Sequence, residues 1–346
     1  MIKETGSRIA APCPCRGETI VLQSFSLSRS ERIKKEYGGW KQLRADCARL
    51  GLNGVEGIWG GESVPDDFPH DLLVGYHLTF FPDWLDFYKE DKAALLRKYG
   101  SMEHVRTFYG DTDGESLVRL YQEDLARARA LGAKYVVFHV SDVSIEEGYT
   151  YRWLHSDEEV IDASAEIINK LLKDIPADFD FLVENQWWPG FTFTDPVKTA
   201  RLMDAIQFKK KGIMLDTGHL MNTNLAIRTQ ADGLTYIRRM LDEHGTLASY
   251  VHGVHLHQSL SGSYVRKNIG CLPQNLPVDC VEQFGFSYAH IQHIDRHRPW
   301  TNPEVMRLVE RISPEYLTHE LAEGSRDVRL RNIQRQINTL KIGESI

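Results

Sequence analysis

Acidic and imidazole side chains recur in this chain at the ends of short apolar runs. Six of them end a run that is rich in branched or aromatic residues: His77, His139, Glu184, Asp216, His257 and Glu320. Carboxylates bind hard divalent cations, and zinc and manganese accept imidazole as well. The mixed set therefore predicts a divalent-metal site, with zinc or manganese preferred and cobalt or magnesium also compatible.

Four of these residues, Glu184, Asp216, His257 and Glu320, are the predicted core ligands. A single histidine at a strand end is more often structural than catalytic, but six comparable positions favour one shared site. Alternate residues of a strand lie on one face. We therefore expect the strand-tip residue to be the ligand, and the residue two places earlier, such as His255 before His257, to fill the layer beneath.

The elements that must position these side chains are strands alternating with helices, as hydrophobic periodicity indicates. The predicted strands are Thr19–Ser24, Gly54–Trp59, Leu73–Leu78, Tyr135–Val140, Phe179–Glu184, Gly212–Asp216, Val251–His257 and Tyr316–Glu320. The predicted helices are Arg32–Leu50, Glu115–Leu131, Glu158–Leu172, Pro196–Ile206, Leu234–His244, Pro303–Ile312 and Arg326–Leu340.

This alternation favours the α/β class and a single (β/α)8 TIM barrel, in one domain over residues 1–346 with the barrel at about 19–340. Its catalytic face is the C-terminal end of the strands. An open doubly wound sheet is the alternative, but no Gly-x-Gly-x-x-Gly turn follows the first predicted strand. After the seventh strand comes a long insertion, and its irregular stretch, Ser259–Tyr288, is predicted to be a lid or binding loop.

The composition of the chain bears on which partners and which cell compartment to expect. The net charge is −7, and Lys209-Lys210-Lys211 is the only dense basic block, which disfavours a nucleic-acid partner without excluding one. The sequence has no apolar run long enough to span a membrane, and the residues through Arg16 do not resemble a secretory signal. Of the five cysteines, Cys13-Pro14-Cys15 is the one close pair. We expect a cytoplasmic protein with free thiols, and an oligomer is compatible with the sequence.

Four motifs occur in order on the predicted strands: Val183-Glu184-Asn185, Leu215-Asp216-Thr217-Gly218-His219, Val254-His255-Leu256-His257 and Thr318-His319-Glu320. With them the chain resembles the xylose isomerase-like TIM barrel superfamily. That group includes sugar phosphate isomerases and epimerases and the endonuclease IV group (AP endonuclease family 2). The epimerase members imply that the four core residues bind one metal, that Glu184 and Glu320 move protons, and that His219 contacts the substrate.

The resemblance to endonuclease IV implies three zinc ions. Its ligand pattern is matched here by His77, His139, Glu184, Asp216, His219, His257, Asp295, His297 and Glu320. Two departures weaken this interpretation. The Asp295-Arg296-His297 triplet follows His257 at an unusually long distance, and Arg298-Pro299-Trp300 replaces the usual Gly-rich segment. An insertion over the mouth would cover a small substrate and obstruct a duplex.

Aromatic and cationic residues complete the predicted site. Trp59, Trp187 and Trp188 lie near strand ends, where aromatic rings can pack against the C–H faces of a sugar. Arg266 and Arg296, with Arg298, can bind a phosphate or carboxylate. Core packing for each tryptophan and surface ion pairing for each arginine are the alternatives.

The leading hypothesis is a divalent-metal-dependent isomerase or epimerase of a sugar, sugar phosphate or related polyhydroxy carbonyl compound. Carboxylate proton transfer through a metal-stabilised enediolate would carry the reaction. One alternative is a trinuclear zinc phosphoesterase resembling endonuclease IV. The other is a barrel that binds a metabolite without turnover. The expected metal content is one to three ions.

Overall fold

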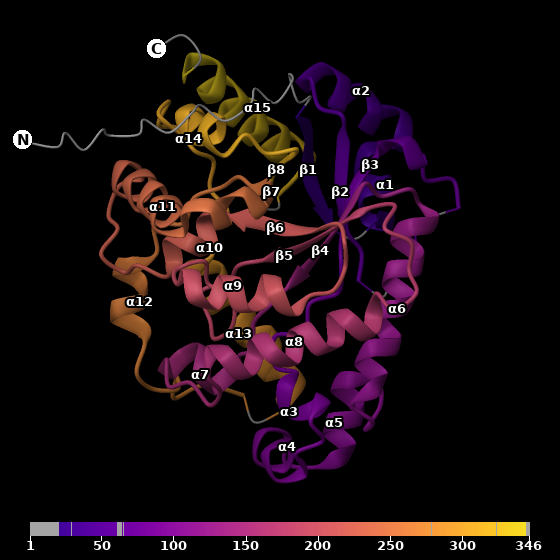
Figure 1. The fold of residues 1–346 in the computed structure, drawn as a ribbon, viewed down its shortest axis with the longest axis vertical. Helices are drawn as coiled ribbons and strands as arrows, with labels where there is room; N and C mark the ends of the chain where they lie inside the picture. The colour runs from indigo at the N-terminus through magenta and orange to yellow at the C-terminus, as the bar shows by residue number, and fades with distance from the viewer. Residues whose placement is uncertain are drawn as a thin grey trace, which may run out of the picture.

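A closed barrel of eight parallel strands forms the centre of the molecule (Figure 1). The structure is a computed structural model, and it describes residues 21–28, 30–60, 64, 66–277, 279–322 and 324–343. The strands are β1 (Leu22–Ser28), β2 (Gly54–Ile58), β3 (Leu73–His77), β4 (Tyr135–His139), β5 (Asp180–Glu184), β6 (Lys211–Asp216), β7 (Val251–His255) and β8 (Tyr316–His319). Each strand pairs with the next, and β1 pairs with β8. The predicted (β/α)8 fold is confirmed.

The first strand lies later than the sequence indicated. The prediction placed it at Thr19–Ser24, whereas β1 is Leu22–Ser28 and includes the whole Ser-Phe-Ser-Leu-Ser run. Phe25 and Leu27 are buried in the main core, while the Ser24 hydroxyl contacts Thr318 inside the barrel. The inward serines hide the strand from a search for apolar runs. Thr19, like Cys13-Pro14-Cys15, lies outside the described residues.

Helices surround the barrel. The outer ring consists of α1 (Ser30–Tyr37), α2 (Trp40–Leu50), α6 (Glu115–Ala130), α8 (Asp157–Leu171), α9 (Pro196–Ala205), α11 (Gln230–His244), α14 (Val305–Ile312) and α15 (Arg326–Gly343). The prediction of one helix over Arg32–Leu50 was wrong. Gly38 and Gly39 have φ values of 64° and 113°, and this left-handed backbone, which glycine adopts readily, separates α1 from α2.

Two inserted helical segments lie beyond the C-terminal ends of the strands. The segment after β3 holds α3 (Leu85–Tyr88), α4 (Lys92–Tyr99) and α5 (Met102–Tyr109), and the segment after β7 holds α12 (Gly262–Asn268) and α13 (Cys280–Ile294). The expectation that Ser259–Tyr288 is irregular was therefore wrong. In Figure 1, α4 and α5 lie at the opposite end of the molecule from α14 and α15. None of the described helices could cross a membrane.

Shorter helices fill the remaining loops: η1 (His70–Leu72), α7 (Ile145–Thr150), α10 (Thr217–Asn222) and η2 (Gly245–Tyr250). Inside the barrel, a small apolar cluster contains Val137, Leu182 and Met214. Each lies two positions before a predicted ligand, His139, Glu184 or Asp216, as strand alternation requires. This layer is a solid floor beneath the residues at the strand tips.

Candidate metal centre

The first group of potential ligands comes from β3, β4 and β5. His77 Nε2 lies 2.9 Å from His139 Nε2 and 3.2 Å from Glu184 Oε2, and His139 Nε2 lies 3.0 Å from the same carboxylate oxygen. Ligand atoms that share a tetrahedral zinc at bonds of ~2.0 Å are roughly 3.3 Å apart. The three atoms therefore have the spacing of three ligands around one ion.

The second group consists of Glu184, Asp216, His255 and Glu320. His255 Nδ1 lies 2.9 Å from Glu320 Oε2 and 3.3 Å from Glu184 Oε1. The sequence prediction joined His257, not His255, to these carboxylates. The structure brings His255 into the group because β7 ends at this residue. His257 lies two residues beyond the end of the strand, further out from the barrel.

The third group contains His219, His257, Asp295 and His297. Asp295 Oδ2 lies 2.5 Å from His297 Nε2 and 3.2 Å from His219 Nε2. Asp216 is the N-cap of α10, and its Oδ1 accepts a hydrogen bond from the His219 backbone N–H at 2.6 Å. This cap fixes the start of α10, and with it the position of His219.

The three groups adjoin one another. Glu184 belongs to both the first and the second, and Asp216 Oδ2 lies 2.8 Å from His257 Nε2 of the third. All nine residues of the predicted trinuclear pattern are present in these groups, and His255 is a tenth member that the prediction left out.

Unpaired ligand atoms show that the second group suits a cation. Glu184 Oε1, His255 Nδ1 and Glu320 Oε2 are buried and make no hydrogen bond of good geometry within the described residues, although they lie at ion-pair distances from one another. Three buried ligand atoms that face one another in this way can share one cation. A divalent cation accepts this mixture of carboxylate oxygen and imidazole nitrogen.

The charges within the centre oppose one another. Burial alone would raise the pKa of Glu184, but the imidazoles of His139 and His255 hold that pKa well below its usual range. Burial alone would lower the pKa of His255, but Glu56, Glu320 and Glu184 raise it well above its usual value. The imidazoles thus serve as counter-charges to the carboxylates, and a metal ion must displace their protons on binding.

A second set of contacts orients the ligands. Glu56 Oε2 lies 3.0 Å from His255 Nε2 and accepts a hydrogen bond of 2.7 Å from the Tyr135 hydroxyl. The other nitrogen of His255, Nδ1, is thereby turned toward Glu184 and Glu320. A carboxylate behind a ligating histidine fixes its ring and raises its basicity. Glu56 was not predicted from the sequence, because it lies in the middle of β2 and not at its tip.

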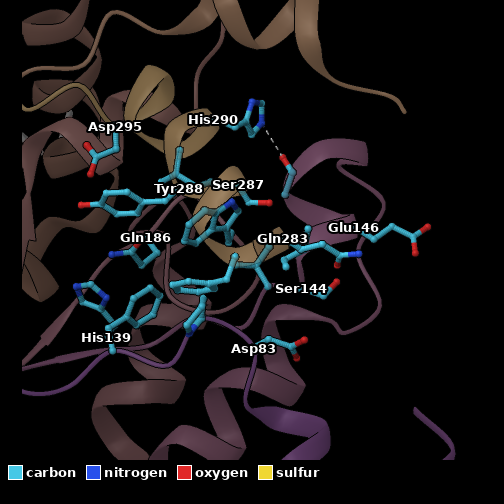
Figure 2. Close-up of a pocket in the computed structure, with 18 of the residues that line it drawn as sticks. Asp83, His139, Ser144, Glu146, Gln186, Gln283, Ser287, Tyr288, His290 and Asp295 are labelled. Carbon is cyan, nitrogen blue, oxygen red and sulfur yellow. Dashed lines mark hydrogen bonds between the residues drawn. The ribbon is translucent and has the colours of Figure 1, made fainter. Parts of the chain in front are cut away.

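A pocket of about 660 Å³ rises from the centre. Its floor includes ligands of all three groups, among them His77, His139, His219, Asp295, His297 and Glu320. Figure 2 shows His139, Gln186 and Asp295 at one end, and Asp83, Ser144 and Glu146 at the other. A volume of this order is typical of small-molecule sites.

The predicted substrate-binding residues divide into two sets. Trp187 and Trp188 line the pocket. Trp59 instead packs in the core against Phe68 and Tyr76. Arg266 donates a hydrogen bond to the Leu225 carbonyl, Arg296 is exposed, and neither arginine is among the described residues that line the pocket. The structure therefore does not bring Trp59, Arg266 or Arg296 to this pocket among the residues that it describes.

Comparison with known families gives a direct match. Residues 44–321 match the family described as xylose isomerase-like TIM barrel. The chain belongs to this family. The resemblance found in the four sequence motifs is thereby confirmed. A comparison with curated proteins found no match.

Solved structures of this family and its neighbours share the barrel. Endonuclease IV from Thermus thermophilus is 16% identical, with 92% of this chain and 99% of that chain covered and a TM-score of 0.53. The structure of AsfvAP:AG is 13% identical, with coverage of 94% and 99% and a TM-score of 0.52. An L-ribulose 3-epimerase is 10% identical, with coverage of 93% and 95% and a TM-score of 0.49. At such low identity, the likeness to the first two structures, whose TM-scores are 0.53 and 0.52, shows the fold alone.

Proposed function

We propose that this protein is a metal-dependent phosphoesterase that hydrolyses a small substrate at a centre of two or three adjoining divalent ions. The observation that carries the proposal is that the three ligand groups adjoin at the floor of one pocket. Glu184 belongs to the first and second groups, and Asp216 of the second group contacts His257 of the third. Adjacent ions ~4 Å apart suit in-line displacement at phosphorus, because they can stabilise the attacking and the leaving oxygen together.

The imidazole-rich first and third groups favour zinc or manganese over magnesium. Such ions would supply Lewis-acid chemistry, by polarising a phosphoryl oxygen and activating water. In the balanced reaction, water attacks phosphorus, the P–O bond to the alcohol breaks, and the alcohol oxygen takes a proton. The chain's own part is to hold the ligands in place. Glu184 spans two groups, Glu56 orients His255, and Gln186 Nε2 lies 3.0 Å from His219 Nδ1.

An isomerase or epimerase, the leading hypothesis from the sequence, is the second candidate. The group of Glu184, Asp216, His255 and Glu320 favours it, because one ion and two glutamates suffice for proton transfer next to a carbonyl. This reaction gives no role to the other two groups, and we therefore place it second. A barrel that binds without turnover would keep the metals and perform neither reaction.

A small substrate fits better than a nucleic-acid duplex. Residues of α4, α5 and α13 line the same pocket as the ligands, so these inserted helices stand over the centre. The net charge of −7 adds no general attraction for a polyanion. The proposed substrate therefore enters the pocket as a single small molecule.

Metal analysis and two activity assays test the proposal. Protein purified without chelator should contain two or three zinc or manganese ions per chain and should hydrolyse small phosphoesters. The competing reaction is followed by incubation with ketoses and aldoses in deuterated water. One ion per chain, α-proton exchange and no phosphoester hydrolysis would establish the second candidate instead. Full metal content without either reaction would support binding alone.

A further inference from the structure

Aromatic rings begin immediately beside the ligands. The Phe80 ring centroid lies 4.3 Å from that of His139, and the Trp187 centroid lies 5.0 Å from that of His219. Phe80 and Trp188 are nearly parallel, with 7° between their planes and 6.5 Å between centroids. The group bonded to a phosphate at this centre must therefore lie against aromatic faces.

The pocket continues away from the ligands along apolar side chains. Val143 and Ile291 extend the aromatic wall, and further out lie Phe108, Leu272 and Phe284, from α5, from the loop after α12 and from α13. Apolar contact of this kind contributes ~25 cal/mol per Å² of surface removed from water. Burial of an apolar group is thus the main source of binding energy in this part of the pocket.

Several polar residues of the outer pocket already have partners within the protein. The Ser144 hydroxyl bonds to Glu147, His290 bonds to the Tyr264 hydroxyl and the Gly148 carbonyl, and Asp83 pairs with Lys98. The Ser287 hydroxyl is buried without a partner among the described residues. The hydroxyls of a sugar that faced the paired residues would lose water without gaining equivalent hydrogen bonds, which is costly.

Two buried indole donors in this wall are unused. Trp187 Nε1 and Trp188 Nε1 are buried and have no acceptor in the part of the chain that the structure describes. Buried N–H groups are nearly always paired. An ether or ester oxygen next to the apolar group would satisfy one of these donors.

We propose that the substrate is a phosphate ester of an apolar alcohol, preferably an aromatic one. Its phosphate would lie at the ligand groups and its ring along Phe80, Trp187 and Trp188. This inference rests on the proposed phosphoesterase function, and it replaces the carbohydrate-like substrate expected from the sequence. The products are phosphate and the free alcohol, formed by addition of one water.

Non-hydrolysable phosphonates separate this inference from the activity. Metal-loaded protein is titrated with naphthylmethylphosphonate, methylphosphonate and glucose 6-phosphate, and binding is followed by tryptophan fluorescence and calorimetry. The naphthyl probe should bind on the order of 100-fold more tightly than methylphosphonate, because about ten additional ring carbons leave water. Glucose 6-phosphate should gain no such advantage.

Ile291→Asn, with Ile291→Val as its matched control, tests the wall itself. The polar variant should weaken binding of the naphthyl probe about tenfold and leave methylphosphonate binding unchanged, since the phosphonate group does not reach this residue. Equal binding of the two phosphonates, or tighter binding of glucose 6-phosphate, would overturn the inference. If the naphthyl preference holds but no aryl phosphate is hydrolysed, the proposed function fails while the pocket assignment stands.

Discussion

Two buried clusters of charged residues in this molecule differ in how their charge is balanced. The ligand groups hold carboxylates that face imidazoles, with several ligand atoms unpaired among the described residues. The other cluster, which we call the lysine cluster, consists of Asp83, Asp86, Asp142, Lys98 and His155. There Lys98 Nζ lies 2.6 Å from Asp83 and 2.7 Å from Asp86.

The lysine cluster is a structural device. Asp142 Oδ1 accepts hydrogen bonds from the backbone N–H groups of Trp84 and Leu85, at 2.7 and 2.9 Å, and so holds the start of α3. Lys98 on α4 supplies the cation that these buried acids need. An acidic cluster therefore indicates a metal where its counter-charges are imidazoles, which can lose a proton and become ligands, and not where its counter-charge is a lysine ammonium, which has no free electron pair. Four predictions test this contrast.

The largest effect is expected from Glu184→Gln, because this carboxylate belongs to two ligand groups. The variant should lose at least one ion per chain, and phosphoester hydrolysis should fall by roughly 10³-fold or more. Metal analysis and kcat/KM are measured on the same sample. Glu123→Gln, an exposed change on α6, is the control. Full metal content and activity in Glu184→Gln would remove the basis of the proposed centre.

Lys98→Met tests the lysine cluster, where the expected loss is of folding stability and not of metal. It leaves the buried Asp83 without its cation and Asp86 with His155 as its remaining partner, so the free energy of unfolding should fall by ~3–5 kcal/mol. Urea unfolding measures this loss, with the exposed Lys92→Met as control. The metal content should not change. Stability equal to the control would show that the lysine is not the necessary counter-charge.

Glu56→Gln tests whether His255 is held from behind. The amide keeps the size of the carboxylate but weakens its hold on His255 Nε2, so metal affinity should fall by about 10–100-fold. Competition with a chromophoric chelator measures the affinity. Asp124→Asn is the matched control, since this buried carboxylate bonds to Tyr76 and Thr79 outside the ligand groups. Equal metal affinities in both variants would contradict the role of Glu56.

The smallest effect is a pH dependence in the lysine cluster. Burial, with the charge of Asp83, raises the pKa of Asp142 to about 7. Because the folded pKa exceeds the unfolded one, the protonated form favours folding at low pH, and this contribution is lost as pH rises from about 4 through about 7. Asp142→Asn removes the titration. Between pH 5 and pH 7 its stability relative to the wild-type chain should increase by ~2 kcal/mol. A constant difference in urea unfolding would refute the assignment.

Most of the barrel could be predicted because alternation of apolar strands and amphipathic helices is a local signal. Most ligand positions could be predicted from the ends of the strands. The depth of each ligand in the barrel could not. His255 and His257 share a face of β7, so a two-residue error in the end of that strand exchanges one for the other. Trp59 lies in the core and not in the pocket because Glu56 points into the barrel, and a strand residue three positions later faces the opposite side. The helix α13 was missed because Gly285 interrupts its sequence and its apolar residues do not gather on one helical face.

The pairing of β1 with β8 also sets an order of events during biosynthesis. Ser24 and Thr318, whose hydroxyls lie 2.9 Å apart, are separated by 294 positions, and Glu320 follows directly after β8. Contacts between such distant residues form late and slowly, because a long chain must first be brought together. A growing chain on the ribosome therefore carries an incomplete ligand set until its last strand emerges. Metal capture at the second group must follow closure of the ring.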